Sequence, residues 1–144
     1  MDIFKFGGAS VKDADGVKNL ANIVRDYKKG NLLIVISAMG KITDKLEKLT
    51  QAFLSQSDEA HAIFDEIKHF HFSIIDELFQ GKANPVYDDV ANTFVEIDWL
   101  IEDEPDNNAD YIYDQIVSIG EVVSTKIVAA WLNAAFSKEQ IKAF

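Results

Sequence analysis

The seven residues from Lys5 to Val11, Lys-Phe-Gly-Gly-Ala-Ser-Val, constrain the fold of this chain more than any other stretch. They begin at the end of an apolar run, residues 2–6, and lead into apolar residues with helical spacing over residues 11–29. This order predicts a strand, a glycine turn and a helix. Backbone N–H groups in such a turn attract anions, helped by the helix dipole. Two adjacent glycines permit positive φ angles and the close approach of a ligand.

Charged and polar residues flank the two glycines. Lys5 lies inside the apolar run, and strand alternation directs it away from the face that holds Phe4 and Phe6. Ser10 suits the N-cap of the following helix, with Asp13 at its third position. A lysine beside a glycine turn at the carboxyl end of a strand predicts a phosphate site. A tight turn with a solvated lysine is the simpler alternative.

A second apolar run at residues 31–36 predicts a second strand. It shows no alternation, which is typical of a strand buried on both faces of a parallel sheet. The unit is therefore β-α-β, and both loops that follow the strands lie at the carboxyl edge, where ligands bind in such sheets. The second of these loops runs from Ser37 to Thr43.

Polar residues of this second loop have candidate roles. Gly40-Lys41 does not make a phosphate-binding P-loop, because Val35 and Ile42 stand where that motif needs glycine and Ser or Thr. Ser37 can donate to a substrate or phosphate, or bond its own backbone. Thr43 either caps the next helix or contacts a ligand, and spacing alone favours the cap.

From residue 43 to residue 136 the apolar spacing predicts helices and almost no strand. The helical pattern breaks at residues 81–85 and 103–108, and the last helix covers about residues 110–136. His69 and His71 stand two apart on one predicted helix, hence on nearly opposite faces, so no metal site is expected from them.

Glu121 is unusual because its neighbours on the last helix are mostly apolar. A buried carboxylate is costly unless it is paired. A structural salt bridge, for example to Lys126, and a functional role are both open on this basis. The adjacent Gly120 removes bulk and lets a strand, loop or ligand come close.

Composition limits the class of protein. The chain has 144 residues, enough for one domain, and a net charge of −10, which disfavours nucleic-acid binding. It has no cysteine, and no stretch is expected to reach the length of a membrane span. The N-terminus enters a strand directly, without the layout of a signal peptide. These features predict a cytoplasmic protein that binds neither nucleic acid nor a membrane.

Three stretches resemble the aspartate kinases, in the same order as in that family. Residues 5–11 resemble the signature Lys-Phe-Gly-Gly-Thr-Ser-Val, with Ala9 in place of threonine. Residues 35–44 resemble the second glycine loop of the family. Residues 118–124 resemble its Ser-x-Gly-Glu-x-x-Ser helix. Together they cover the chain from Met1 to about Leu132.

The resemblance implies an α/β fold, the three-layer amino-acid kinase (carbamate kinase-like) fold, here as a β-α-β start with a helical block. It implies phosphoryl transfer from ATP with Mg²⁺ to the β-carboxylate of L-aspartate. Each candidate site residue then has an implied role. Lys5 is the catalytic residue; the phosphates are held by Lys5, Gly7, Gly8, Ser10 and Ser37; and aspartate is bound by Thr43, Glu121 and Ser124.

The resemblance also implies parts that follow this stretch in the family, namely the rest of the nucleotide-binding region and regulatory ACT domains. Residues 1–144 are therefore expected to be the N-terminal part of a kinase domain, inactive alone, in a protein that forms a homo-oligomer. Another amino-acid kinase is the nearest alternative. A non-catalytic module that binds an anion or nucleotide is the other.

Overall fold

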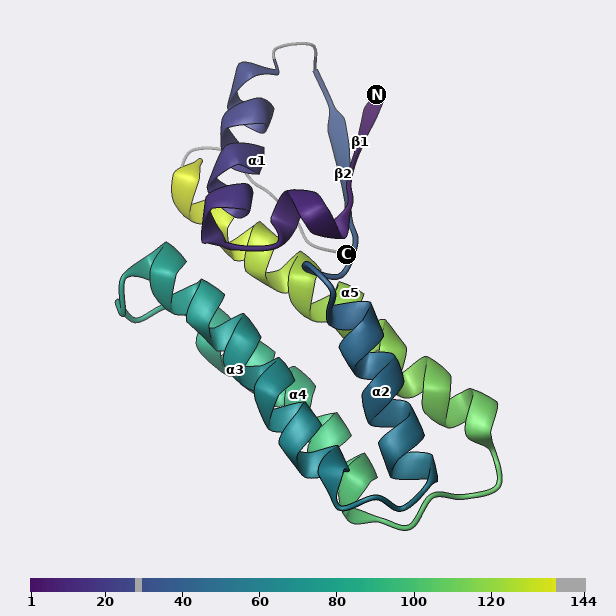
Figure 1. The fold of residues 1–144 in the computed structure, drawn as a ribbon. Helices are drawn as coiled ribbons and strands as arrows, with labels where there is room; N and C mark the ends of the chain where they lie inside the picture. The colour runs from purple at the N-terminus through teal and green to yellow at the C-terminus, as the bar shows by residue number, and fades with distance from the viewer. Residues whose placement is uncertain (28–29, 137–144) are drawn as a thin grey trace.

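The computed structural model describes residues 1–27 and 30–136. Figure 1 shows a small β-α-β unit at one end and four long helices extending from it. The elements in chain order are β1 (Asp2–Phe6), the short 3-10 helix η1 (Gly8–Val11), α1 (Ala14–Asp26), β2 (Leu32–Ile36), α2 (Ile42–Leu54), α3 (Glu59–Phe79), α4 (Val86–Glu102) and α5 (Ala109–Ala135).

The predicted β-α-β unit is confirmed. β1 and β2 pair in parallel, with Asp2 opposite Leu32 and Phe6 opposite Ile36. Phe4 and Phe6 turn toward the core while Lys5 is exposed, as strand alternation predicts. Both strands therefore end at the same edge, and the two loops that follow them meet there.

The outer face of the sheet is open, so the prediction that β2 is buried on both faces is wrong for the part of the chain described. Ile3, Leu33 and Val35 are 61%, 40% and 40% exposed. A continuous apolar run is typical of a strand covered on both faces, and no described element covers this face. A parallel sheet is normally covered on both sides.

The helical block follows the predicted breaks. The chain turns at Gln80 and Gly81, which have φ angles of 54° and 69°, and α4 begins directly after Pro85. α2 packs against α3 and α5, and α4 packs against α5. α5 also contacts α1 and β2, and α3 contacts α1, so these two helices join the block to the β-α-β unit (Figure 1).

α5 begins and ends within one residue of the range predicted for the last helix. By length and composition it is sufficient to cross a membrane, which corrects the expectation that no stretch approaches that length. Its apolar residues are shared with α2 and α4 in the core, including Ile116, Val123 and Ile127, each fully buried. These contacts are those of a core helix.

His71 and His69 lie on opposite sides of α3, as predicted. His69 is exposed, whereas His71 is fully buried beside Phe94, and its Nδ1 lies 2.8 Å from the carbonyl oxygen of Ile67. Nε2 of His71 has no hydrogen-bond partner among residues 1–27 and 30–136. Burial lowers the pKa of His71 from 6.5 to about 4, partly opposed by the bond to Ile67.

Stability is expected to fall as pH decreases from 6.5 to 4. In this window the unfolded chain protonates His71 and the folded chain does not, so acid favours unfolding, by roughly 3 kcal/mol at the lower end. Urea unfolding at several pH values measures this slope. In His71→Phe the loss of unfolding free energy between pH 6.5 and pH 4 should be smaller by about 2 kcal/mol or more. In His69→Phe this loss should be unchanged. An equal slope in both variants would contradict this prediction.

Candidate functional site

The loops after β1 and β2 interlock at the carboxyl edge of the sheet. The Ser37 N–H donates to the Phe6 carbonyl at 3.0 Å, and the Gly40 N–H donates to the Gly8 carbonyl at 2.9 Å. A Cβ on Gly8 would lie 2.6 Å from the Ala38 carbonyl oxygen and 2.7 Å from that of Gly40. Gly8 is thus required because two backbone segments touch at this position.

The glycine turn differs from prediction in its backbone angles. Gly7 is extended, with φ −76°, and the positive φ in this region belongs to Gly40, at 55°. Nothing would meet a Cβ on Gly7. The close neighbour of Gly8 is therefore the backbone of the second loop rather than a ligand, and the positive φ is found in that second loop.

Ser10 does not cap the first helix. It lies in η1, where its N–H donates to the Gly7 carbonyl at 2.9 Å, and its side chain is exposed. The N-cap of α1 is Asp13, whose Oδ1 accepts the Gly16 N–H at 2.8 Å. A 3-10 turn thus separates the glycines from the helix, and the Ser10 hydroxyl stays available at the loop surface.

Thr43 does not cap α2 either, although its spacing in the sequence favoured that role. α2 begins at Ile42, with Lys41 at the N-cap position and no side-chain cap bond. Thr43 lies exposed in the first turn, immediately after the loop that contains Gly40. Its hydroxyl makes no hydrogen bond within the described residues, which leaves it free for a ligand.

A hollow of about 320 Å³ opens between the start of α2 and the first half of α5. Thr43 from α2 and Glu121 from α5, two of the predicted site residues, share its wall. The remaining lining residues all come from α5: Tyr113, Asp114, Val117 and Ser118. The lining holds two carboxylates and no Lys or Arg, so it favours a cationic group such as an ammonium.

Glu121 is exposed, which corrects the expectation of a buried carboxylate. The buried face of α5 carries Gly120, Val123 and Ser124, and Glu121 lies outside that face, toward the hollow. The alternative of a salt bridge to Lys126 is wrong. The Lys126 ammonium donates to the Thr93 hydroxyl at 2.7 Å instead.

Ser124 is fully buried and does not line the hollow. Its hydroxyl donates to the Ser37 carbonyl at 2.7 Å, so it ties α5 to the loop after β2. Gly120 permits the same close approach. A Cβ there would lie 2.8 Å from Leu46 Cδ1 and 3.0 Å from Ala38 Cβ, so the neighbour that Gly120 admits is protein.

Tyr113 holds the rim of the hollow. Its hydroxyl donates to the Glu47 carboxylate at 2.9 Å, across from α5 to α2, and this bond raises the pKa of Tyr113. Tyr113 and Asp114 line the hollow but were not predicted as site residues. Asp114, Val117, Ser118 and Glu121 are spaced by three, one and three residues, which is one face of a helix, and this spacing was a usable signal.

Lys5 projects from the exposed face of β1 and has no ion pair or hydrogen bond within the described part of the chain. It stands one residue before Phe6, whose carbonyl anchors the second loop. Among residues 1–48, nine Lys and Arg outnumber six Asp and Glu, although the whole chain is strongly acidic. The interlocked loops therefore lie in the cationic part of the sequence, which suits phosphate.

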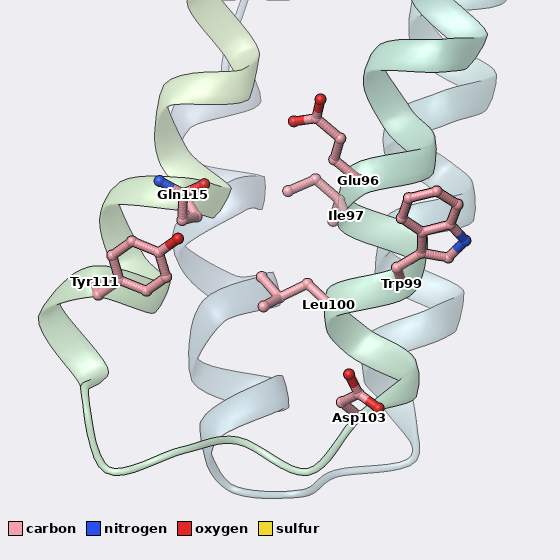
Figure 2. Close-up of a pocket in the computed structure, with 7 residues that line it drawn as sticks. All are labelled: Glu96, Ile97, Trp99, Leu100, Asp103, Tyr111 and Gln115. Carbon is pink, nitrogen blue, oxygen red and sulfur yellow. The ribbon is translucent and has the colours of Figure 1, made fainter.

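No group of three His, Asp or Glu side chains within the described residues could hold a metal ion. The residues around the loops therefore do not by themselves make a Mg²⁺ site. A second hollow, of about 250 Å³, lies between α4 and α5 (Figure 2). None of the predicted site residues lines it.

Comparison with known proteins shows the family. The model of the amino acid kinase family matches residues 3–143. The chain therefore belongs to the amino acid kinase family, as its motifs and fold predicted.

The similar proteins are aspartokinases. The chain is 30% identical over 136 residues to chloroplastic aspartokinase 1 of Arabidopsis thaliana, covering 91% of the chain and 23% of that protein. It is 30% identical over 124 residues to lysine-sensitive aspartokinase 3 of Escherichia coli strain K12, covering 85% and 26%. The crystal structure of E. coli aspartokinase III with aspartate and ADP superposes with a TM-score of 0.80 at 28% identity, covering 94% and 29%. The chain thus spans about a quarter of the length of these relatives.

Proposed function

We propose that this chain is the N-terminal part of the catalytic domain of an aspartate kinase. Such an enzyme transfers the γ-phosphoryl group of ATP to the β-carboxylate of L-aspartate, giving 4-phospho-aspartate, the first step toward lysine, threonine and methionine. The observation that carries the proposal is the hollow that collects Thr43 and Glu121 beside the interlocked glycine loops. The similarity to aspartokinases supports it. A cytoplasmic homo-oligomer belongs to the same proposal.

The charges of the hollow support one orientation of the substrate. The carboxylates of the hollow repel the two carboxylates of aspartate and attract its ammonium group, so the ammonium sits at Glu121. The β-carboxylate then points toward the loops, where Thr43 donates to it at the end nearest Gly40. Ser124 acts indirectly in this arrangement, because its bond to Ser37 fixes the loop against α5.

Phosphoryl transfer needs positioning and charge stabilisation rather than covalent help from the protein. A β-carboxylate oxygen attacks the γ-phosphorus, the bond to the bridging oxygen breaks, and ADP leaves. Lys5 offsets the negative charge on the transferred group, while Gly7, Gly8, Ser10 and Ser37 hold phosphate oxygens. Mg²⁺ would screen the charge of the phosphates when bound.

The test is ADP release by the protein encoded in the complete open reading frame, with aspartate, glutamate and acetylglutamate as separate acceptors. Turnover should require aspartate and fall by at least about 100-fold in Lys5→Ala, because a charge that stabilises the transferring group is lost. Lys48→Ala is the matched control, since Lys48 is an exposed lysine of α2 beyond the loops. Turnover with another acceptor, or equal rates in both variants, would overturn the proposal.

Glu121→Gln should weaken aspartate binding specifically. Loss of one charge-assisted hydrogen bond predicts a rise of about 10- to 100-fold in the KM for aspartate, with the KM for ATP unchanged within about twofold. Steady-state kinetics of the same protein measures both constants. Asp110→Asn, at an exposed position of α5 outside the hollow, is the control. A rise in the ATP constant instead would remove Glu121 from the aspartate site.

A further inference from the structure

The hollow between α4 and α5 has no part in the proposed reaction, yet its lining is distinctive. Figure 2 shows Ile97 and Leu100 reaching from α4 into the space between the helices, with Tyr111 and Gln115 opposite them on α5. The carboxylates of Glu96 and Asp103 lie at its two ends along α4. The hollow thus has an apolar floor, an aromatic wall formed by Tyr111 and two acidic ends, while the ring of Trp99 lies on the other side of α4 (Figure 2).

Two aromatic side chains of this lining are unusually exposed. Trp99 is 67% exposed and Tyr111 is 53% exposed, and neither the indole N–H nor the phenol hydroxyl makes a hydrogen bond within the described residues. Exposed aromatic side chains next to apolar ones are typical of contact surfaces. They contribute most to binding when a partner covers them.

The negative charge around the hollow favours a partner that carries a positive charge. Residues 83–125 contain eleven Asp and Glu and no Lys, Arg or His. Of these carboxylates only Asp98 forms a salt bridge in the part of the chain described, to Lys68 at 2.9 Å. Glu96 and Asp103 are both without a cationic partner there. An aromatic face beside unpaired carboxylates attracts an organic cation.

The volume of the hollow indicates whether it binds a single side chain or a whole small molecule. The hollow measures about 250 Å³, below the range of roughly 300–1,000 Å³ for small-molecule sites. It has room for one guanidinium or ammonium group with part of its apolar stem. A second copy of the same acidic face would bring like charges together, so it is a poor occupant.

We propose that the α4–α5 face is a docking surface for a protein partner that inserts an arginine side chain into this hollow. The guanidinium lies between the carboxylates of Glu96 and Asp103 and against the aromatic wall, and its stem covers Ile97 and Leu100. Arginine fits better than lysine because its planar head both stacks on rings and binds carboxylates. The proposal is independent of the kinase reaction.

The probe is a peptide of four Gly-Arg repeats, titrated into the full 144-residue chain and followed by the indole N–H signals in NMR spectra. The chain has two tryptophans, and the indole N–H of the second, Trp131, is buried, which gives an internal reference. The Trp99 signal should shift and saturate while the Trp131 signal stays. The same peptide with citrulline, which is neutral and nearly isosteric, should bind at least about tenfold more weakly.

Matched variants separate the hollow from general acidity. Glu96→Gln with Asp103→Asn should weaken binding at least tenfold, whereas Asp88→Asn with Asp89→Asn should weaken it less than twofold. Asp88 and Asp89 are exposed on the same helix, and Asp89 lies two turns before Glu96. Equal losses in the two double variants, equal binding of the citrulline peptide, or no shift of Trp99 would each overturn the proposal.

Discussion

Replacing Gly8 by alanine is expected to destabilise the chain by at least about 3 kcal/mol and to abolish the phosphate binding that we propose for the loops. The added methyl group would lie 2.6 Å and 2.7 Å from the carbonyl oxygens of Ala38 and Gly40. Overpacking against side chains costs typically 1–3 kcal/mol, because those can rotate away. Here the obstacles are backbone atoms in a loop already held by the bonds from Ser37 to Phe6 and from Gly40 to Gly8, so the loops must separate.

Gly7→Ala is the control for this prediction. The same methyl group at Gly7 would meet nothing, and the residue has an ordinary extended conformation. Urea unfolding should therefore show less than about 0.5 kcal/mol of change. Binding of inorganic triphosphate, measured by calorimetry, should persist in Gly7→Ala, which keeps the backbone N–H at position 7, and vanish in Gly8→Ala, where the loops must separate. Equal stability of the two variants would mean that the two loops do not interlock as described.

Gly120→Ala should cost a net of about 1–3 kcal/mol, although alanine is the better helix former. Its helix propensity alone would stabilise by roughly 1 kcal/mol. Against this, the methyl group would lie 2.8 Å from Leu46 Cδ1 and 3.0 Å from Ala38 Cβ. Leu46 is fully buried and has little room to move, and Ala38 is part of the interlocked loop. α5 must then shift away from α2.

The shift should also have a functional result, because Thr43 and Glu121 face one another across the same pair of helices. We expect the KM for aspartate to rise in Gly120→Ala even at temperatures where the protein is folded. Val122→Ala, at an exposed neighbouring position of α5, controls for helix propensity. If the Gly120→Ala protein is more stable than the parent, the gain in helix propensity outweighs the close contacts of the added methyl group with Leu46 and Ala38.

Much of the fold follows from local sequence pattern. The two apolar runs predicted the parallel strands, and helical spacing predicted α2 to α5 with breaks near Gly81 and Pro85. The heptapeptide at Lys5 located the loop that the structure places at the sheet edge. These features depend on neighbours within about one helical turn or one strand, which is why a single sequence reveals them.

The exposure of the Glu121 side chain could not be predicted from local sequence pattern. Its sequence neighbours are apolar, but each residue of a helix is rotated by about 100° from the last, so burial depends on which side of α5 meets α2. The contacts of Gly120 with Leu46 and of Ser124 with Ser37 fix that rotation. They join residues more than seventy positions apart, and they turn Glu121 outward to the hollow.

The sequence by itself determined the family, the β-α-β start, the order of the helices and which residues carry suitable chemistry. Only the tertiary structure decided which of those residues meet. It brought Thr43 and Glu121 together, placed Ser124 in a buried contact with the loop after β2, and formed a second hollow between α4 and α5. The physical reason is that local pattern sets the periodicity of burial within each element, whereas a site is formed by long-range packing that aligns particular faces of separate helices.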